Sequence, residues 1–301
     1  MIHRSVLLAE AVDLLDPRPG GIYVDGNLGM GGHSREILRR SAPSGRVIGF
    51  DWDEAALDMA RHNLAEFGHR VDFVHDNFAV IPERLKERRV EKIDGLLLDL
   101  GLSSYQLTGS ERGFSFQGSE PLDMRMDKRR QLTAAKLLNT ASAADLADIF
   151  YHYGEERQAR RIAAFVVEYR RGKNFVSTDQ LVDVVERAVP RRFRPKKIHV
   201  ATKVFQALRI AVNGELDNLL KILMHGPQIL KQGAVFAVIS FHSLEDRLVK
   251  RAFQNNPSLS AVTRKPVIAG EDELLVNPRA RSAKLRAVRQ QSPATAKKGM
   301  L

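Results

Sequence analysis

Short apolar runs rich in β-branched residues alternate with helical patterns over the first hundred residues. Four such runs occupy residues 22–25, 46–51, 71–76 and 93–99. Each run ends in an aspartate. Between the second and third runs, Leu57, Ala60, Leu64 and Phe67 recur at the steps of one helix face. This β-α-β-α order predicts a parallel, doubly wound α/β sheet with helices on both faces.

The strand pattern disappears from about Thr108 to Val212, and apolar residues recur there at helical spacing. A helical pattern at residues 216–230 and a buried strand at 234–240 then restore the α/β order. A helical block between two α/β stretches is most simply an insertion. We therefore predict a discontinuous sheet domain, an inserted helical domain and a disordered tail, over residues 1–108 with 213–290, 109–212 and 291–301 respectively.

The charge of the chain is strongly positive and unevenly placed. Lys and Arg number 47 against 36 Asp and Glu, a formal net charge of +11. Basic residues gather without acidic ones between Arg187 and Arg209, and again after Glu273. Such clusters are typical of proteins that bind a polyanion, because neutralised phosphates release their counterions. A plain solvated surface is the alternative.

The composition excludes several classes of protein. The chain has no Cys, which removes disulfide frameworks, thiolate zinc sites and cysteine nucleophiles. No apolar stretch is long enough for a membrane span, so we expect no membrane partner. The opening residues lack the apolar core and cleavage site of a signal peptide. We therefore expect a cytoplasmic protein. We also expect no metal site, since nothing near His242 suggests a set of metal ligands.

The first apolar run leads into a glycine-rich turn before a helical segment. Four glycines fall within seven residues, from Gly26 to Gly32, and allow backbone to approach a ligand closely. Open α/β sheets bind ligands at the carboxyl ends of their strands, so we interpret this turn as a ligand site. A dinucleotide fingerprint would need a third glycine where Ser34 stands. A tight turn without a ligand remains the alternative.

Acidic residues at the strand ends indicate which ligand the turn would take. Asp51 stands where a carboxylate accepts the hydroxyls of a ribose. Asp76, Asn77 and Phe78 could hold an adenine, while Asp25 and Asp99 add carboxylates. Several converging carboxylates repel a pyrophosphate but attract a ligand with an ammonium and a sulfonium, such as S-adenosylmethionine. Taken singly, each aspartate could instead cap a turn or a helix.

An ordered series of longer motifs spans nearly the whole chain. The motifs are DGNLGMGGHS at 25–34, LLDLGLSS at 97–104, RGFSF at 112–116, PLDMRMD at 121–127, YGEER at 153–157, FQALRI at 205–210, VNGEL at 212–216, ISFHSLEDR at 239–247 and NPRARS at 277–282. In this order they resemble the motifs of the bacterial 16S ribosomal RNA cytosine-N4 methyltransferases. A single glycine loop would be weak evidence, but the ordered series is highly specific.

The resemblance implies a class I (Rossmann-like) S-adenosylmethionine methyltransferase sheet with an inserted all-helical domain for substrate recognition. It also implies that the target is the N4 amine of a cytosine in the decoding region of small-subunit ribosomal RNA. Whether the partner is naked RNA or the assembled small subunit stays open, as does the choice between monomer and homodimer. Matching motif positions imply that the S-adenosylmethionine site is lined by Gly31, Gly32, His33, Asp51, Phe78, Asp99 and Gln106.

The chain departs from the family pattern at three places. Asn27 stands where Thr is usual, and Tyr105 stands where Pro is usual before Gln106. The segment HVATK at 199–203 replaces the usual His-Pro-Ala-Thr-Arg. Its Lys203 keeps the charge but loses any bidentate phosphate contact.

The chemistry requires acceptors for the amino hydrogens of the cytosine, because the N4 lone pair is delocalised into the ring. We expect Asp99, with Ser103 as a helper, to supply them. The alternative is that Asp99 only orients the cofactor. The expected RNA contacts are Arg125, His242, Arg247, Arg279 and Arg281. The histidine could instead be structural, and each arginine could instead pair with a carboxylate.

Two other functions remain in competition. A nicotinamide-dependent oxidoreductase is disfavoured by Ser34 and by the acidic strand ends. A catalytically silent RNA-binding or assembly factor on a methyltransferase scaffold would bind RNA without transferring a methyl group.

Overall fold

The computed structural model of the chain describes residues 4–292, apart from the side chains of residues 104 and 108. The described chain divides into two compact units. The first contains the residues up to Ser103 and those from Leu216 onward, and the second is Ser104–Glu215. Of the predicted tail, residues 293–301 lie outside the described residues. That residues 109–212 recognise the substrate stays a prediction.

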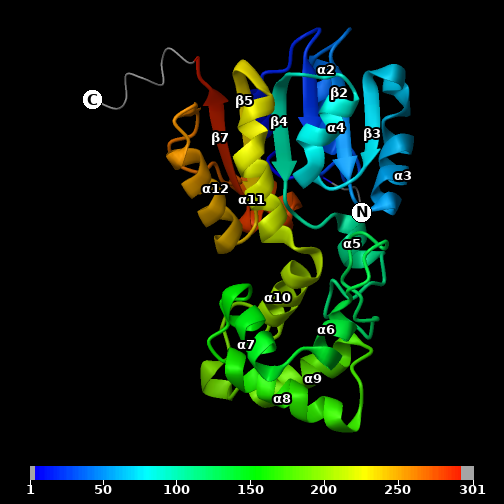
Figure 1. Ribbon diagram of the computed structural model, residues 1–301, viewed down its shortest axis with the longest axis vertical. Coiled ribbons are helices and arrows are strands. Elements are labelled where there is room, and N and C mark those ends of the chain that lie inside the picture. The colour runs from blue at the N-terminus through cyan, green and yellow to red at the C-terminus, as the bar shows by residue number, and fades with distance from the viewer. Residues whose placement is uncertain (1–3, 293–301) are drawn as a thin grey trace. The chain divides into compact units, whose positions relative to one another are not determined.

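A seven-stranded mixed sheet lies at the centre of the first unit (Figure 1). Its strands are β1 Ile22–Asp25, β2 Arg46–Asp51, β3 Val71–His75, β4 Ile93–Asp99, β5 Leu230–Ser240, β6 Leu259–Ala261 and β7 Lys284–Gln290. Their spatial order is β3-β2-β1-β4-β5-β7-β6. β1 to β5 pair in parallel, as the alternating pattern predicts, and the α/β fold class is confirmed. The antiparallel pair β6 and β7 was not predicted.

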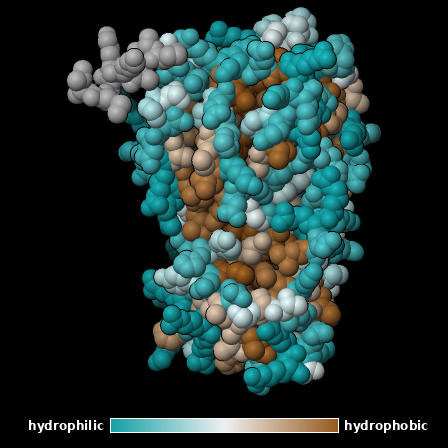
Figure 2. Space-filling view, in the orientation of Figure 1, coloured by the Kyte–Doolittle hydropathy of each residue, from teal (hydrophilic) through white to brown (hydrophobic). Residues whose placement is uncertain are grey.

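Helices cover both faces of this sheet. Those of the first unit are α1 Leu8–Leu15, α2 Gly32–Arg40, α3 Glu54–Asn63, α4 Ile81–Glu87, α11 Glu215–His225, α12 Ser243–Asn255 and α13 Glu271–Val276. Short 3-10 turns lie at Ala65–Arg70, Phe78–Val80, Gly226–Ile229 and Pro278–Ser282. Apolar side chains of α4, α11 and α12 form one core with the sheet, and those of α1, α2 and α3 form another on the opposite face. The outer surfaces of the helices on the near face are mostly hydrophilic (Figure 2).

Strand register brings three aspartates to one edge of the sheet. Asp25 ends β1 and pairs with Gly49 of β2 and Leu97 of β4. Each of these partners lies two residues before an aspartate, Asp51 in β2 and Asp99 in β4. Because the three strands are parallel neighbours, their carboxyl ends and their aspartates lie together.

The second unit is helical. Its helices are α5 Ser104–Thr108, α6 Ala134–Thr140, α7 Ala143–His152, α8 Ala159–Gly172, α9 Thr178–Ala188 and α10 Thr202–Asn213, with a 3-10 turn at Arg191–Phe193. Ser142 and Asp145 form a capping box at the start of α7. No helix in residues 4–292 combines the length and the apolar character that crossing a membrane would require.

One buried amide holds a long loop of the second unit onto α10. The side chain of Asn213 is fully buried, and its Oδ1 accepts from the Met126 N–H at 2.9 Å. Its Nδ2 donates to the carbonyls of Met124 at 2.7 Å and of Arg209 at 2.9 Å. Met124 has a positive φ of 57°, so the loop backbone there depends on external contacts.

We expect Asn213→Ala to lower the free energy of unfolding by about 2 to 4 kcal/mol, because it leaves buried backbone groups without partners. Denaturation followed by far-UV circular dichroism measures the loss. Gln117→Ala, at an exposed position of the same unit, is the matched control and should change stability by less than about 0.5 kcal/mol. Equal midpoints for the two variants would contradict the anchoring role of Asn213.

Candidate functional site

Three carboxyl groups lie at the carboxyl edge of the sheet without a Lys or Arg partner among the described residues. Asp25 is 1% exposed, Asp51 is 8% exposed, and the side chain of Asp99 is 21% exposed. Within residues 4–292, no Lys or Arg forms an ion pair with any of them. Burying acidic groups without compensating cations costs free energy, so this cluster is poised to accept positive charge from a ligand.

The turn between β1 and α2 is tied directly to the end of β2. The Gly29 N–H donates to Asp51 Oδ2 at 2.8 Å, and the Asp53 N–H donates to Oδ1 at 2.9 Å. Each oxygen of Asp51 therefore keeps a lone pair for another donor. The carboxyl group is fixed in place, and it can still accept the two hydroxyls of a ribose.

Gly31 and Gly29, both in this turn, differ in what surrounds the position of a Cβ. Gly31 has a φ of +85°, and a Cβ at this position would lie 2.8 Å from Leu64 Cδ1. Gly29 has a φ of +54° and open space where its Cβ would be. Only the first glycine is thus required by neighbouring side chains. The space at the second leaves the backbone of the turn open to a ligand.

Asp25 and His33 flank the glycine-rich turn, and hydrogen bonds fix both side chains. Asp25 Oδ2 accepts from the Ser34 hydroxyl at 2.7 Å, which gives Ser34 a role where a dinucleotide fingerprint has glycine. His33 Nε2 lies 3.0 Å from the Val6 carbonyl, and its Nδ1 lies 3.8 Å from Asp99 Oδ2. Burial lowers the pKa of His33, so its imidazole is neutral at pH 7 and does not balance the acids. Burial likewise raises the pKa of Asp25.

Asp99 presents an acceptor that no described residue uses. Its Oδ1 is buried and finds no hydrogen-bond donor among residues 4–292, while the carboxyl group receives the Gly101 N–H. Burial, together with the negative charge of Glu245, raises the pKa of Asp99 to about 7, against the effect of the Gly101 N–H. Burial also raises the pKa of Asp51 to about 7, against the effect of its two N–H donors. Both groups therefore titrate close to neutral pH.

The surroundings supply further polar atoms that lack partners. Asn27 Oδ1 and Asn77 Nδ2 are buried and unpaired among the described residues. Trp52 follows Asp51 and is 8% exposed, with its ring centroid 6.4 Å from that of Phe78. Phe78 itself is 5% exposed and packs in the core. Asn77 is one of the residues expected to hold an adenine, whereas Asn27 and Trp52 are not among the predicted cofactor residues. The positions of Asn27 beside Gly26 and of Trp52 beside Asp51 in the chain were the available signal.

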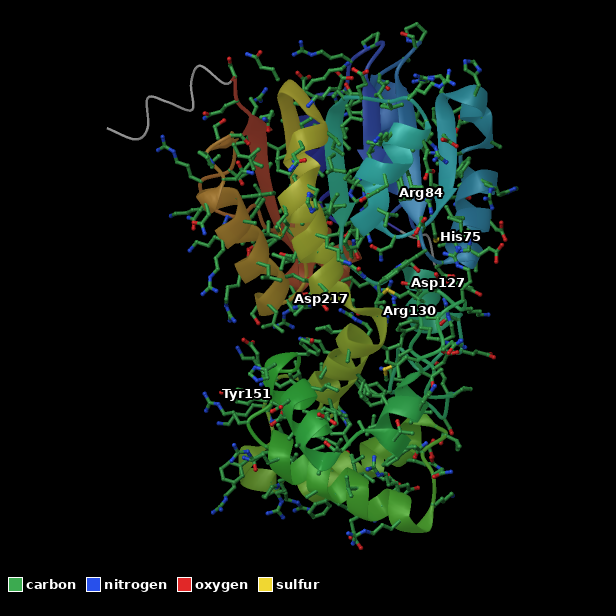
Figure 3. The ribbon with its side chains drawn as sticks, viewed as in Figure 1. His75, Arg84, Asp127, Arg130, Tyr151 and Asp217 are labelled. Carbon is green, nitrogen blue, oxygen red and sulfur yellow. The ribbon has the colours of Figure 1, made fainter. Side chains whose placement is uncertain are left out.

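Asp76 differs from the other strand-end acids. Arg84, labelled on α4 in Figure 3, binds it with a nitrogen–oxygen distance of 2.7 Å. This ion pair neutralises Asp76 within the protein. Within the part of the chain that the structure describes, the strand-end acids that lack a Lys or Arg partner are therefore Asp25, Asp51 and Asp99, at the ends of β1, β2 and β4.

These features fit S-adenosylmethionine as a ligand. The acids without cationic partners suit its ammonium and sulfonium groups, and Asp51 has lone pairs for its ribose. The unpaired Asn27 and Asn77 atoms and the open backbone at Gly29 offer hydrogen-bonding capacity. A pyrophosphate would be repelled by the same acids.

The remaining predicted residues fall in both units. Ser103 follows β4 in the first unit and is partly buried. Gln106, on α5 of the second unit, is 6% exposed. Arg125, in the same unit, binds Asp123 through two nitrogens at 2.6 and 2.8 Å and donates to two loop carbonyls. Arg125 thus organises its own loop, and its contact with RNA stays a prediction.

The other predicted RNA contacts lie late in the first unit. His242 is the N-cap of α12, where its Nδ1 accepts from the Glu245 N–H at 3.4 Å, and its Nε2 lies 3.2 Å from Glu245 Oε1. These contacts give the histidine a structural role. Arg247 and Arg281 are exposed, and Arg279 is partly buried, which lowers its pKa. His242 and Arg281 line one pocket of about 350 Å³.

Comparison with known proteins finds similar sequences over nearly the whole chain. The model of the MraW methylase family matches residues 1–291. "Ribosomal RNA small subunit methyltransferase H" of Desulfotalea psychrophila is 57% identical over 285 residues, covering 95% of this chain and 97% of that protein. The protein of the same name from Geotalea uraniireducens is 51% identical, with 95% and 97% covered. Among solved structures, an rRNA methylase from Streptococcus thermophilus matches with a TM-score of 0.41 and 10% identity, covering 97% of this chain and 100% of that one.

We expect Asp51→Ala to weaken binding of S-adenosylhomocysteine by about 1.5 to 3 kcal/mol, because charge-assisted hydrogen bonds to the ribose are lost. Isothermal titration calorimetry measures the change. Asp58→Ala is the control, since Asp58 is an exposed acid of α3 paired with Arg61. A folded Asp51→Ala protein with unchanged affinity would disprove the ribose-binding assignment.

Affinity for S-adenosylhomocysteine should rise between about pH 6 and about pH 8. The pKa values of Asp51 and Asp99 are raised to about 7, so both carboxyl groups are mostly protonated at the lower pH. Their ionised forms accept hydroxyl hydrogens and attract the ligand's ammonium, so binding releases protons. Titrations in buffers of different ionisation enthalpy count these protons. Asp51→Asn should reduce the number, Asp58→Asn should not, and a flat profile would contradict the assignment.

Proposed function

We propose, since the chain belongs to the MraW methylase family, that it methylates the N4 amine of a cytosine in the decoding region of small-subunit ribosomal RNA. It is a methyltransferase that uses S-adenosylmethionine as its methyl donor. The RNA substrate is inferred from sequence identity. The chain is 57% and 51% identical, each time over 95% of its length, to proteins named as small-subunit ribosomal RNA methyltransferases. The acidic site supports the choice of donor.

In the proposed reaction the nucleophile is the N4 amine of cytosine, which is weak because its lone pair is delocalised. The protein therefore has to restore electron density to that nitrogen. When bound, S-adenosylmethionine supplies a methyl group on a positively charged sulfur. Asp99 Oδ1 lacks a partner, and a pKa of about 7 leaves a large fraction ionised at neutral pH. We propose that this oxygen accepts a hydrogen of the cytosine amine and thereby localises the nitrogen lone pair. Ser103 is the proposed helper at the end of the same segment.

The other residues of the site are proposed to bind and orient. Asp51 would accept the ribose hydroxyls while its N–H donors hold it still. Gly31, Gly32 and His33, at the start of α2, would lie against the donor, and the neutral imidazole leaves the acidic character of the site intact. Positioning of this kind supplies much of the rate enhancement in displacement reactions.

The RNA must present its base unstacked, because the amine cannot be reached inside a helix. We propose that the helical unit holds the flanking RNA and that an aromatic side chain such as Tyr105 stacks on the displaced base. The substrate is naked RNA or the assembled small subunit, the enzyme acts as a monomer or a homodimer, and the proposed location is the cytoplasm.

The direct test is transfer of labelled methyl groups to small-subunit RNA and to small-subunit particles. Mass spectrometry of the digested RNA should identify N4-methylcytidine at one nucleotide, and only when this protein is added. Binding of RNA without incorporated label would instead identify a silent assembly factor.

Asp99→Asn separates catalysis from cofactor orientation within the same assay. We expect kcat to fall by about 100-fold or more, because the amide is a poor proton acceptor. Affinity for S-adenosylhomocysteine should fall much less than kcat does, because an acceptor oxygen remains although the negative charge is lost. Asp58→Asn is the control and should leave both unchanged. A loss of affinity with kcat preserved would show that Asp99 only orients the cofactor.

A further inference from the structure

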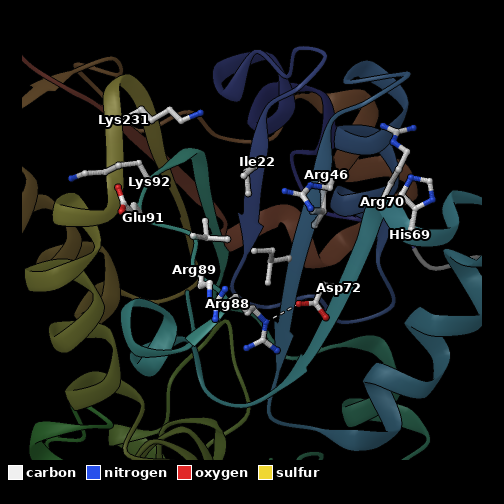
Figure 4. A pocket seen from close by; sticks show the side chains of 13 residues that line it. Ile22, Arg46, His69, Arg70, Asp72, Arg88, Arg89, Glu91, Lys92 and Lys231 are labelled. Carbon is white, nitrogen blue, oxygen red and sulfur yellow. Dashed lines mark hydrogen bonds and ion pairs between the residues drawn. The ribbon is translucent and has the colours of Figure 1, made fainter. Parts of the chain in front are cut away.

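A second pocket lies at the opposite edge of the sheet, where the parallel strands begin. Its volume is about 710 Å³, and residues that start or precede β1 to β5 line it. Figure 4 shows Arg46, His69 and Arg70 on one side, Glu91, Lys92 and Lys231 on the other, and Arg88 and Arg89 between them. All of these residues belong to the first unit. The pocket is thus separated from the acidic site by the length of the strands.

The lining of this pocket is strongly cationic. Six of its thirteen residues are Lys or Arg, and two are Asp or Glu. Two cations have carboxylate partners, Arg88 with Asp72 at 2.7 Å and Lys231 with Asp94 at 2.8 Å. The other four cations have no carboxylate partner among the described residues. The pocket therefore carries excess positive charge.

Of the four cations without a carboxylate partner in the described part of the chain, two are held by hydrogen bonds and two are not. Arg70 donates to the Gly45 and Leu38 carbonyls, and Lys92 donates to the Gln228 carbonyl. These bonds orient the side chains without neutralising them. The guanidinium groups of Arg46 and Arg89 are exposed and contact no hydrogen-bond or ion-pair partner within residues 4–292. Both can bind an anion without breaking an existing interaction.

Arg89 also occupies an unfavourable backbone conformation. Its φ is +56°, in the left-handed region that favours glycine or asparagine. The turn between α4 and β4 therefore displays a long cationic side chain at a position where a smaller residue would be more stable. Strain of this kind is often found at functional sites.

Strand order arranges the basic residues as a stripe. The amino edge of the sheet carries a basic residue at five of the six strands from β3 to β7, all except β1. In spatial order these residues are Arg70, Arg46, Lys92, Lys231 and Arg289. Neighbouring strands lie about 4.8 Å apart, so this stripe extends over roughly 20 Å or more. A single phosphate needs donors that converge on one point, whereas charges spaced along an edge match a chain of phosphates. The corresponding upper part of Figure 2 is mostly hydrophilic.

We propose that this amino-edge pocket, defined by Arg46, Arg70, Arg89 and Lys92, binds the phosphate backbone of an RNA segment distant from the target cytosine. The proposal rests on the proposed function, because it takes ribosomal RNA as the substrate. The half-buried Ile22 and Val90 give the pocket an apolar floor on which a ribose or base can pack. The pocket strengthens RNA binding and takes no part in methyl transfer.

The test uses the double variant Arg46→Gln/Arg89→Asn in the full chain. Asparagine tolerates the left-handed conformation and Arg46 is exposed, so folding is preserved. Filter binding with a labelled transcript of small-subunit RNA should give a Kd about 10-fold higher, and a plot of log Kd against log salt that is shallower by about 1.5 to 2 because two cations are lost. The KM for RNA should rise in parallel, with kcat and S-adenosylhomocysteine affinity unchanged.

Arg61→Gln/Arg251→Gln removes the same charge from exposed positions on α3 and α12 and is the matched control. Its Kd should stay within about 2-fold of the unmodified protein. Equal Kd values for the two double variants would overturn the proposal, as would a fall in kcat confined to the pocket variant. Displacement of RNA from the unmodified protein alone by about 1 mM pyrophosphate or adenosine monophosphate would identify a small phosphate ligand instead. Failure of the unmodified protein to form N4-methylcytidine would count against the proposed function, whereas the Kd comparison does not depend on methyl transfer.

Discussion

The first unit is organised around buried acids that lack cations. Parallel pairing of β2, β1 and β4 brings Asp51, Asp25 and Asp99 to one edge, and burial raises the pKa of each. The protein lowers the cost of this arrangement only in part, with N–H donors on Asp51 and a hydroxyl on Asp25. Partial protonation, which the raised pKa values reflect, offsets the rest in the free protein. A cationic ligand stabilises the ionised carboxylates instead, and this links the fold to the choice of methyl donor.

The same sheet carries opposite charge at its two ends. The carboxyl edge has acids without cationic partners, whereas the amino edge has cations without carboxylate partners. Neither arrangement follows from the net charge, which would allow both edges to be basic. In a parallel sheet, all strand starts lie at one edge and all strand ends at the other, so residue choice at strand termini controls each edge separately.

Local sequence patterns revealed the acidic edge but not the basic one. Each acid directly ends an apolar run, and the turn beside Asp25 is rich in glycine, so both features are visible within short segments. By contrast, Arg46, Arg89 and Lys231 are far apart in the chain, and only the strand order brings them to the lining of one pocket. β7 was not predicted, because the charged residues Lys284, Arg286 and Arg289 interrupt its buried apolar residues Leu285, Ala287 and Val288. The unpaired atoms of Asn27 and Asn77 likewise depend on tertiary packing.

Charge separation also bears on how an RNA enzyme can use an acidic site. Carboxylates at the transfer site repel phosphates, so the RNA backbone is kept away from Asp99 while an uncharged base can approach it. A base reaches that position only when it is unstacked and turned away from its own backbone. Binding energy for this distortion has to come from contacts with other parts of the RNA, and a basic surface remote from the acids can provide it without weakening their field. In the proposed complex the amino edge of the sheet thus binds the RNA backbone, and the carboxyl edge admits a single base.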